Sequence, residues 1–275
     1  MKIGIELEVL GNRRAALQAI RAAGVDCRDS GYTHATTAHW KIVDDGSIGV
    51  RGFEVVSPVL ESSNEQQMGD VRKVCDALVA AQCTVDRSCG FHVHVDASGI
   101  SQPGFKTLVK VFAKFEPVMD SFMPASRRNN TYCRSLLQVV GVTQAPTGEN
   151  LPVLLQQFFQ RVDRCTDLRE LHRLLMGTRY LKLNLESFWR HGTVEFRQHS
   201  GTTDAAKVLN WIEFCTGMVE RCMREHTRVT LDGAGSLDTL FKAVRRPGLK
   251  RFYRMRAEIL NGTRPDRRNA LENAA

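Results

Sequence analysis

The order of predicted elements indicates an α+β protein in which an antiparallel or mixed sheet carries helices on one face. Two observations support this class. Short segments with period-two alternation occur both early and late in the chain, and a long stretch with helical patterning separates them. Since the sequence has no internal repeat and no low-complexity linker, we predict one domain over 1–262 with a helical insertion around 103–176, followed by a flexible basic tail over 263–275.

The first strand is predicted over residues 2–10, where apolar side chains alternate with Gly4, Glu6 and Glu8. A Gly turn in DDGS predicts that the two segments beside it form a hairpin. The elements predicted for the first half are a helix over 12–24, strands over 39–43 and 51–57, a helix over 63–82, a strand over 91–96 and a helix from 103 to about 122.

The second half begins with an irregular polar segment and then turns mainly helical. Polar residues with Pro and Gly predict a loop over 143–150. The other predicted elements are helices over 151–162 and 166–176, strands over 180–186 and 192–198, and helices near 204–226, 235–245 and 248–261.

Composition is that of a soluble globular protein, with 43% apolar and 25% charged residues in 275. No apolar run approaches the ~20 residues that span a membrane, and the early carboxylates argue against an export signal, so we expect a cytoplasmic protein. The eight cysteines form no CxxC pair, which argues against a zinc finger or ribbon. We expect them to be reduced, buried core residues.

The net charge is +8, which suits an anionic partner such as ATP, an acidic substrate or a nucleic acid. The basic residues of the C-terminal end fit two interpretations, a solvated helix face with a tail or a surface for a polyanion such as nucleic acid. They are Arg245, Arg246, Lys250, Arg251, Arg254, Arg256, Arg264, Arg267 and Arg268.

Four predicted strands share one unusual pattern, because each has an apolar face and an opposite face with charged or imidazole groups. The polar residues are Glu6 and Glu8, Glu54 near the Asp44–Asp45 turn, His92 and His94, and Glu195 and Arg197. If the strands are neighbours, several carboxylates and two imidazoles converge on one surface and repel one another unless cations are present. Oxygen ligands with an occasional His suit Mg²⁺ or Mn²⁺, and an Arg among them suits an anionic ligand.

Seven stretches in a fixed order resemble the amidoligase family, a branch of the glutamine synthetase and glutamate–cysteine ligase superfamily of carboxylate–amine ligases. They are GIELE (4–8), W-K-x-x-x-DGS (40–47), FEVVSP (53–58), GFHVHVD (90–96), RRNNTYC (127–133), RYLKLNL (179–185) and GTVEFRQHSGT (192–202). The resemblance implies a glutamine-synthetase-like fold, a curved antiparallel sheet of about five to six strands with helices on the convex face. The concave face would be the active site.

The resemblance also implies a role for each matched position. The metal ligands would be Glu6, Glu8, Glu54, His92 and Glu195, holding two or three Mg²⁺ or Mn²⁺ ions. Arg197 would contact the transferring phosphoryl group of ATP, and Asp45 would form an acidic pair with Glu54. His94 would lie near the phosphates. The further nucleotide or substrate residues would be Arg128, Asn130, Tyr132, Arg179 and Asn184. Apart from the resemblance, the chemistry needs a base for the amine proton, and we suggest Asp45 for it.

The implied activity joins a small-molecule or peptide carboxylate to an amine through an acyl phosphate formed from ATP. No GxxxxGK[ST] loop is present, and none is needed where metals carry the phosphates. Two other functions fit the same residues. A metal-dependent amide or phosphoester hydrolase also uses Glu, Asp and His clusters, and a basic polyanion-binding module would need no turnover at all.

Overall fold

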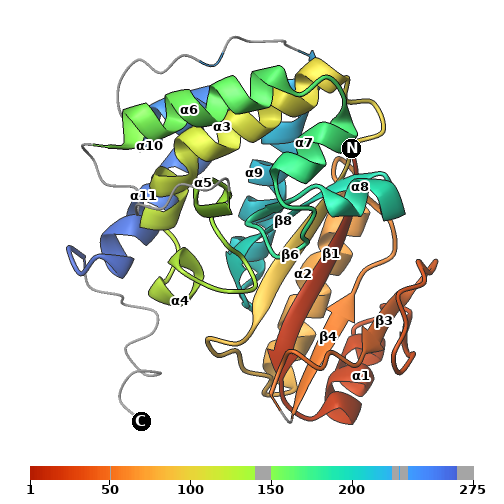
Figure 1. Cartoon of the computed structure of the whole chain (residues 1–275). Helices are drawn as coiled ribbons and strands as arrows, with labels where there is room; N and C mark the ends of the chain where they lie inside the picture. Colours follow the sequence, from red (N-terminus) through yellow and green to blue (C-terminus); the bar gives the residue numbers. More distant parts are fainter. Residues whose placement is uncertain (50, 140–149, 225–228, 230–234, 265–275) are drawn as a thin grey trace.

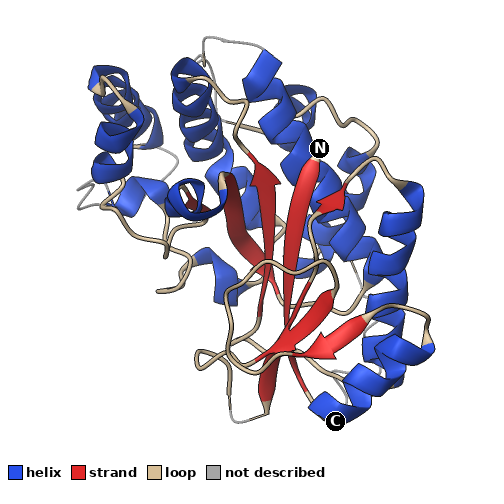
Figure 2. Cartoon of the chain, turned by 90° about the vertical axis from the view of Figure 1, so that its right-hand side faces the viewer, coloured by secondary structure: helices blue, strands red, loops and turns tan. Residues whose placement is uncertain are grey.

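The computed structural model describes residues 1–49, 51–139, 150–224, 229 and 235–264. The described residues form one twisted, open sheet of eight strands, shown in red in Figure 2. Its path is β2-β3-β4-β1-β6-β8-β7, and β5 pairs with β1 beside this path. The strands are β1 (Lys2–Leu10), β2 (Cys27–Asp29), β3 (Trp40–Val43), β4 (Gly52–Val56), β5 (Leu60–Glu61), β6 (Gly90–Asp96), β7 (Leu183–Asn184) and β8 (Thr193–Ser200).

Helices begin where the sequence supplies side-chain caps. Asn12, Asn64 and Ser101 each accept a hydrogen bond from a backbone N–H in the first turn of α1, α2 and α3. The helices are α1 (Arg13–Ala22), α2 (Glu65–Ala80), α3 (Gln102–Ser121), α4 (Ala125–Arg128), α5 (Leu136–Val139), α6 (Leu151–Arg164), α7 (Leu168–Leu174), α8 (Glu186–His191), α9 (Ala205–Arg224), α10 (Leu237–Ala243) and α11 (Leu249–Leu260).

The apolar face of the sheet is covered by helices. Helix α2 contacts α1 and α9, α9 contacts β6, and α3 contacts α9, so these helices form one layer behind the strands (Figure 1). The alternating residues Ile5, Leu7, Val93 and Phe196 are fully buried on this side. Burying such side chains is the main stabilising term of the fold and leaves the other strand face for polar residues.

A buried ion cluster joins the helical segment to the end of the sheet. The ammonium group of Lys182, which is 0% exposed, lies 3.0 Å from a Glu116 oxygen and 2.8 Å from an Asp120 oxygen, both on α3. Gln198 of β8 donates a further hydrogen bond to Asp120 at 2.7 Å. The backbone of Lys182 accepts a hydrogen bond from the N–H of Arg197, so this cluster supports the strand that carries Arg197.

Most predicted elements are confirmed, with three corrections. The sheet has eight strands instead of five or six, because the short β2 and β5 carry too few residues to show alternation. It is also mixed, which the element order allowed but the resemblance did not imply, since β2 pairs parallel with β3 while the other strand pairs are antiparallel. The strand predicted over 180–186 is only β7, because Lys182 turns toward α3 and Glu186 begins a short helix that ends at Gly192 with φ +68°.

Some predictions fall on other parts of the chain. The predicted loop lies outside the described residues except for Asn150, as do the last two residues of the helix predicted to end at 226. Residues 265–275 of the predicted tail also lie outside them. The domain boundaries stay a prediction, although α3 to α7 do fall between β6 and β7 in chain order.

Burial of the cysteines is confirmed, since all eight are buried and free of disulfide bonds. Burial raises the pKa of the Cys27 thiol to about 11 and that of Cys75 to about 12. None of the described helices has the length and apolar character that crossing a membrane requires.

Most of the basic residues near the C-terminus that the structure describes are engaged with acidic or carbonyl neighbours. Arg246 pairs with Glu213 and Glu220, while Lys250 and Arg254 both pair with Asp238. Ion pairs of this kind reduce the charge that a polyanion would meet. These pairs fit a solvated helix surface, and the polyanion surface stays a prediction.

Candidate functional site

Strand register brings the predicted polar residues together on the uncovered face of the sheet. Glu8 of β1 lies directly opposite Glu54 of β4, and Glu6 lies opposite His92 of β6. His94 in turn lies opposite Glu195 of β8. Two carboxylates in directly opposed positions destabilise a sheet unless something neutralises them. The pairing is therefore a feature that stability alone does not explain.

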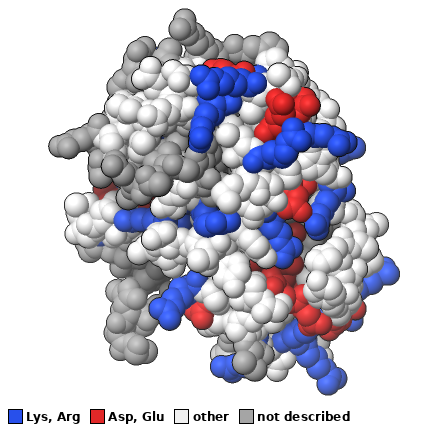
Figure 3. Space-filling view, viewed as in Figure 1, with Lys and Arg blue, Asp and Glu red and all other residues white. Residues whose placement is uncertain are grey.

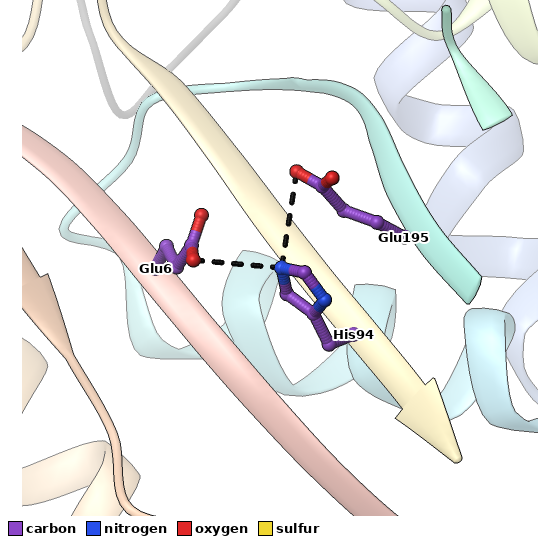
Figure 4. Close-up of side chains that lie close together, drawn as sticks. All are labelled: Glu6, His94 and Glu195. Carbon is purple, nitrogen blue, oxygen red and sulfur yellow. Dashed lines mark ion pairs between the residues drawn. The ribbon is translucent and has the colours of Figure 1, made fainter. Parts of the chain in front are cut away.

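The imidazoles sit among the carboxylates at short range. His92 Nδ1 lies 3.1 Å from a Glu6 oxygen and 3.6 Å from a Glu195 oxygen, and His92 Nε2 lies 3.5 Å from a Glu8 oxygen. His94 Nε2 lies 3.4 Å from a Glu6 oxygen and 3.9 Å from a Glu195 oxygen. Figure 4 shows the His94 ring between these two carboxylates. His92 is 3% exposed and Glu195 is 4% exposed, so these contacts lie at the bottom of the site.

Three overlapping triads in the described part of the chain have the geometry of cation sites. In each, one ligand atom per residue lies within 4.8 Å of the others. Neighbouring triads share Glu6 or Glu54, which makes a continuous row. The triads are Glu6, His94 and Glu195; Glu6, Glu54 and His92; and Glu8, Asp45 and Glu54. Carboxylate oxygens with imidazole nitrogens are a donor set that fits Mg²⁺ or Mn²⁺.

The charges in this row are unevenly balanced. Burial acts to raise the pKa of Glu6, but the charge and hydrogen bonds of His94 and His92 outweigh it and hold the pKa well below its usual value. Burial, followed by repulsion from Glu6 and Glu8, instead raises the pKa of Glu54 well above its usual value. Among the described residues no ion pair within 4.0 Å offsets this repulsion at Glu54, and a bound cation would relieve it.

We expect Glu54→Gln to stabilise the metal-free protein at pH 8. Because the folded-state pKa of Glu54 lies above its unfolded value, ionised Glu54 weakens the fold progressively as pH rises through the folded pKa. The gain should be much smaller at pH 4.5, where wild-type Glu54 is protonated in the folded state and about half protonated in the unfolded state. A gain of about 1 kcal/mol would raise the Tm by roughly 2–4 °C. Thermal unfolding in EDTA at pH 4.5 and pH 8 measures this.

Glu54→Gln should also bind Mn²⁺ at least about tenfold more weakly than wild type, because Glu54 is a charged ligand in two of the triads. Glu61→Gln is the matched control, since Glu61 is half-exposed and pairs only with the chain terminus among the described residues. A lower Tm for Glu54→Gln at pH 8 would show that no repulsion is stored at this position.

Arg197 and Asn184 hold Glu195 from two sides. The Arg197 guanidinium donates to one Glu195 oxygen, and Asn184 Nδ2 donates to the other at 2.6 Å. Burial acts to raise the pKa of Glu195, but the charges of Arg197, His94 and His92 outweigh burial and lower the pKa below its usual value. Glu195 therefore stays ionised. The Asn184 oxygen is also engaged, since it accepts from the N–H of Glu186 at 2.8 Å. Asn184 therefore orients Glu195.

A cavity of about 500 Å³ lies over this row, and Figure 3 shows acidic atoms in a hollow with basic side chains around it. At its rim Tyr132 packs edge-on against Tyr180 with ring centroids 5.7 Å apart. The Arg179 guanidinium lies 5.1 Å from the centre of the Tyr180 ring. Aromatic and arginine groups at the mouth of an acidic cavity could stack on a flat ring and hold an anion.

The structure brings most predicted site residues into this cavity but places two outside its lining. Asp45 lines it, with one carboxylate oxygen accepting hydrogen bonds from the N–H and hydroxyl of Ser47, both at 2.7 Å. Arg128 points away and donates to the Met123 carbonyl at 2.8 Å and to Asn261. Asn130 is used within its own loop, where it bonds the Ser126 carbonyl and the N–H of Tyr132.

Several lining residues were missed by the sequence analysis. Arg127, and not its neighbour Arg128, faces the cavity, and it donates to the backbone carbonyls of Arg197 and Gln198. A Cβ at Gly90 would come within 2.7 Å of His92 and 3.2 Å of Arg127, so only glycine leaves room for this packing. The RR pair was visible in the sequence and the resemblance assigned the role to Arg128, but adjacent residues on a short helix point in different directions.

A second cavity of about 620 Å³ adjoins the first on the same face. The two share a boundary that includes Glu6, Glu54, His94 and His191. The second cavity extends past Lys41 and Asp96 to the apolar residues Pro58 and Val59. The row of carboxylates is therefore accessible from two directions.

The open α+β sheet and the cavity on its polar face define a protein with an enzyme-like site. The chain belongs to the family described as "Putative amidoligase enzyme", whose model matches residues 1–219. This membership confirms the resemblance and supports a ligase. No curated protein matches the chain.

Proposed function

We propose that this protein is an ATP-dependent carboxylate–amine ligase that uses divalent cations. The observation that carries the proposal is the row of three linked triads beside Arg197, which lies beneath two adjoining cavities. A reaction between two anions, a nucleotide and a carboxylate, needs such an arrangement of ligands and a cation. Family membership supports the same activity class.

The residues divide by the group they would hold. Glu6, Glu8, Glu54, His92 and Glu195 would hold Mg²⁺ or Mn²⁺, and Asp45 completes the third triad. Bound cations would neutralise phosphate charge. Tyr132, Tyr180 and Arg179 would hold the nucleotide at the mouth of the first cavity, which places the second cavity on the side of the other substrates. Both substrates would meet at the boundary formed by Glu6, Glu54 and His94.

Two bond exchanges complete the proposed reaction. A carboxylate oxygen of the acid attacks the γ-phosphorus of ATP, the bond to ADP breaks, and an acyl phosphate forms. The amine nitrogen then attacks the acyl carbon, phosphate leaves, and the ammonium proton passes to a base. Arg197 would stabilise the transferring phosphoryl group, because it lines the first cavity beside Glu195 and carries a fixed positive charge. Asp45 at the cavity edge is the base we propose.

A hydrolase would use the same ligands without nucleotide, so one assay separates the two functions. ADP release is measured with Mg²⁺ against a panel of amino acids, peptides and polyamines. We expect release that depends on one acid–amine pair, stops in EDTA, and falls at least about a hundredfold in Glu8→Gln. Hydrolysis of amides or phosphoesters without nucleotide would instead establish the hydrolase. Binding of polyanions without any turnover would support the binding module.

A further inference from the structure

Residues 31–36, which we call the strap, lie over the polar face of the sheet between β2 and β3. Tyr32, Thr33 and His34 line the first cavity, and Thr33, His34, Ala35 and Thr36 line the second. The strap therefore forms part of the wall that the two cavities share. It has no regular secondary structure to hold it there.

Backbone hydrogen bonds fix the ends of the strap. The N–H of Ser30 donates to the Ile42 carbonyl at 3.0 Å, and the N–H of Asp44 donates to the Gly31 carbonyl at 3.0 Å. Past the other end, the Thr37 hydroxyl donates to the His39 carbonyl. None of these hydrogen bonds involves residues 32–36, the middle of the strap.

Lys41 of β3 contacts the middle of the strap. Its ammonium donates to the Ala35 carbonyl at 2.6 Å and lies 3.5 Å from the Thr33 carbonyl. Among the hydrogen bonds of the described residues, these are the ones that join the middle of the strap to a strand. The Tyr32–His34 hydrogen bond, at 3.0 Å, stays within the strap.

Neighbouring carboxylates attract the ammonium group of Lys41, although burial disfavours its charged form. Lys41 is 4% exposed, and burial lowers its pKa, whereas the charges of Glu54 and Glu6 oppose that shift. Register explains this field, because Lys41 pairs with Val56 and Val43 pairs with Glu54, which puts Lys41 and Glu54 on the same face. The charged Lys41 ammonium is attracted by the carboxylate row, and its positive charge therefore disfavours the binding of a cation to that row.

We propose that Lys41 is a positioning residue that pins the strap to the sheet and thereby shapes the wall between the two cavities. A lysine suits this role because its long stem reaches from a buried strand and its ammonium serves two carbonyls at once. The sequence motif W-K-x-x-x-DGS contains this lysine, whose role neither the cation row nor the nucleotide contacts explain.

Hydrogen exchange of the full chain tests the pin directly. In Lys41→Met we expect amides 32–37 to exchange at least about tenfold faster, since two charge-assisted hydrogen bonds are lost. Lys41→Arg, which can still donate, should restore most of the protection. The control is Lys106→Met, since Lys106 also donates to a backbone carbonyl, that of Asp163, but lies on α3 away from the cavities. Unchanged exchange of the strap in Lys41→Met would overturn the proposal.

Two binding measurements separate a positioning role from a merely structural one. Mn²⁺ alone should bind Lys41→Met about fivefold more tightly than wild type, because the repelling ammonium is gone. The analogue AMP-PNP with Mg²⁺ should bind about fivefold more weakly, since a loose strap lowers the competent fraction, and Lys41→Arg should recover the wild-type affinity. Faster strap exchange with unchanged affinity for both probes would overturn the role in shaping the cavity.

The AMP-PNP measurement rests on the proposed function, whereas exchange and Mn²⁺ binding do not. If wild-type protein binds no AMP-PNP, the proposed ligase fails while the exchange data still decide the assignment of Lys41. If wild type binds AMP-PNP and the strap does not loosen in Lys41→Met, the ligase stands and the assignment fails.

Discussion

Replacing Arg197 by Met should lower kcat by at least about 10³-fold, because one arginine on a transferring phosphoryl group contributes that much or more. KM for ATP should change far less, since Arg197 would act on charge that develops during transfer and not on the bound ground state. The kcat of Arg197→Lys should fall between that of wild type and that of Arg197→Met, because lysine keeps the charge without the planar fork of donors. Steady-state kinetics with the acid–amine pair found in the ADP assay measure this.

Folding of the Arg197 variants must be checked, since Arg197 also pairs with Glu195 and its Nε donates to the Tyr132 carbonyl. Glu195 would keep the hydrogen bond from Asn184, so we expect a folded protein with an unchanged circular dichroism spectrum. Arg254→Met is the matched control, because Arg254 pairs with Asp238 on the surface away from the cavities. A fully active Arg197→Met would remove Arg197 from the mechanism.

The largest loss of stability should follow Lys182→Met. The substitution leaves Glu116 and Asp120 facing each other without their buried cation, and breaking such a pair costs about 3–5 kcal/mol. For a chain of this size that corresponds to a Tm lower by roughly 6–20 °C. Urea unfolding measures the loss in free energy of unfolding, and thermal unfolding measures the change in Tm.

The pH dependence of this loss identifies its cause. Without Lys182, the pKa of Asp120 should rise further, since burial already raises it and Lys182 opposes that shift. A carboxyl whose pKa is higher in the folded than in the unfolded state lowers the free energy of unfolding as pH rises through the folded-state pKa. The variant Lys182→Met should therefore lose more stability at pH 8 than at pH 5. A pH-independent loss would point to a packing defect instead. Lys73→Met, which breaks an exposed pair with Asp70, should cost under ~1 kcal/mol.

The sequence predicted the strands that build the site because those strands are buried on one face. Alternation of the kind seen at Ile5, Glu6, Leu7 and Glu8 is a strong signal when a whole face must be apolar. Which strands are neighbours did not follow from alternation and came from the family resemblance. The observed register then places Glu6 opposite His92 and Glu8 opposite Glu54.

The parts that sequence reasoning missed depend on contacts between distant segments. The strap has no periodicity, so its place over the sheet depends on tertiary contacts such as those of Lys41. Arg127 and Arg128 are adjacent and chemically equal, and only the packing of α4 against β8 decides which one faces the cavity. The α3 carboxylates that pair with Lys182 are 62 and 66 residues away in sequence, beyond the range of local patterns.

The pairing of β1 with both β4 and β6 limits how this chain can change in length over evolution. One residue inserted within β1 would turn the following side chains to the opposite face, so that a glutamate would meet the helices and a leucine the cavity. Insertions in loops would leave the pairing intact. The irregular pairing of β6 with β8 between Phe91 and Val93 is part of the same constraint, since it sets how His94 meets Glu195. This protein can tolerate substitutions and longer loops, whereas the insertion or deletion of a single residue in these strands would disrupt the site.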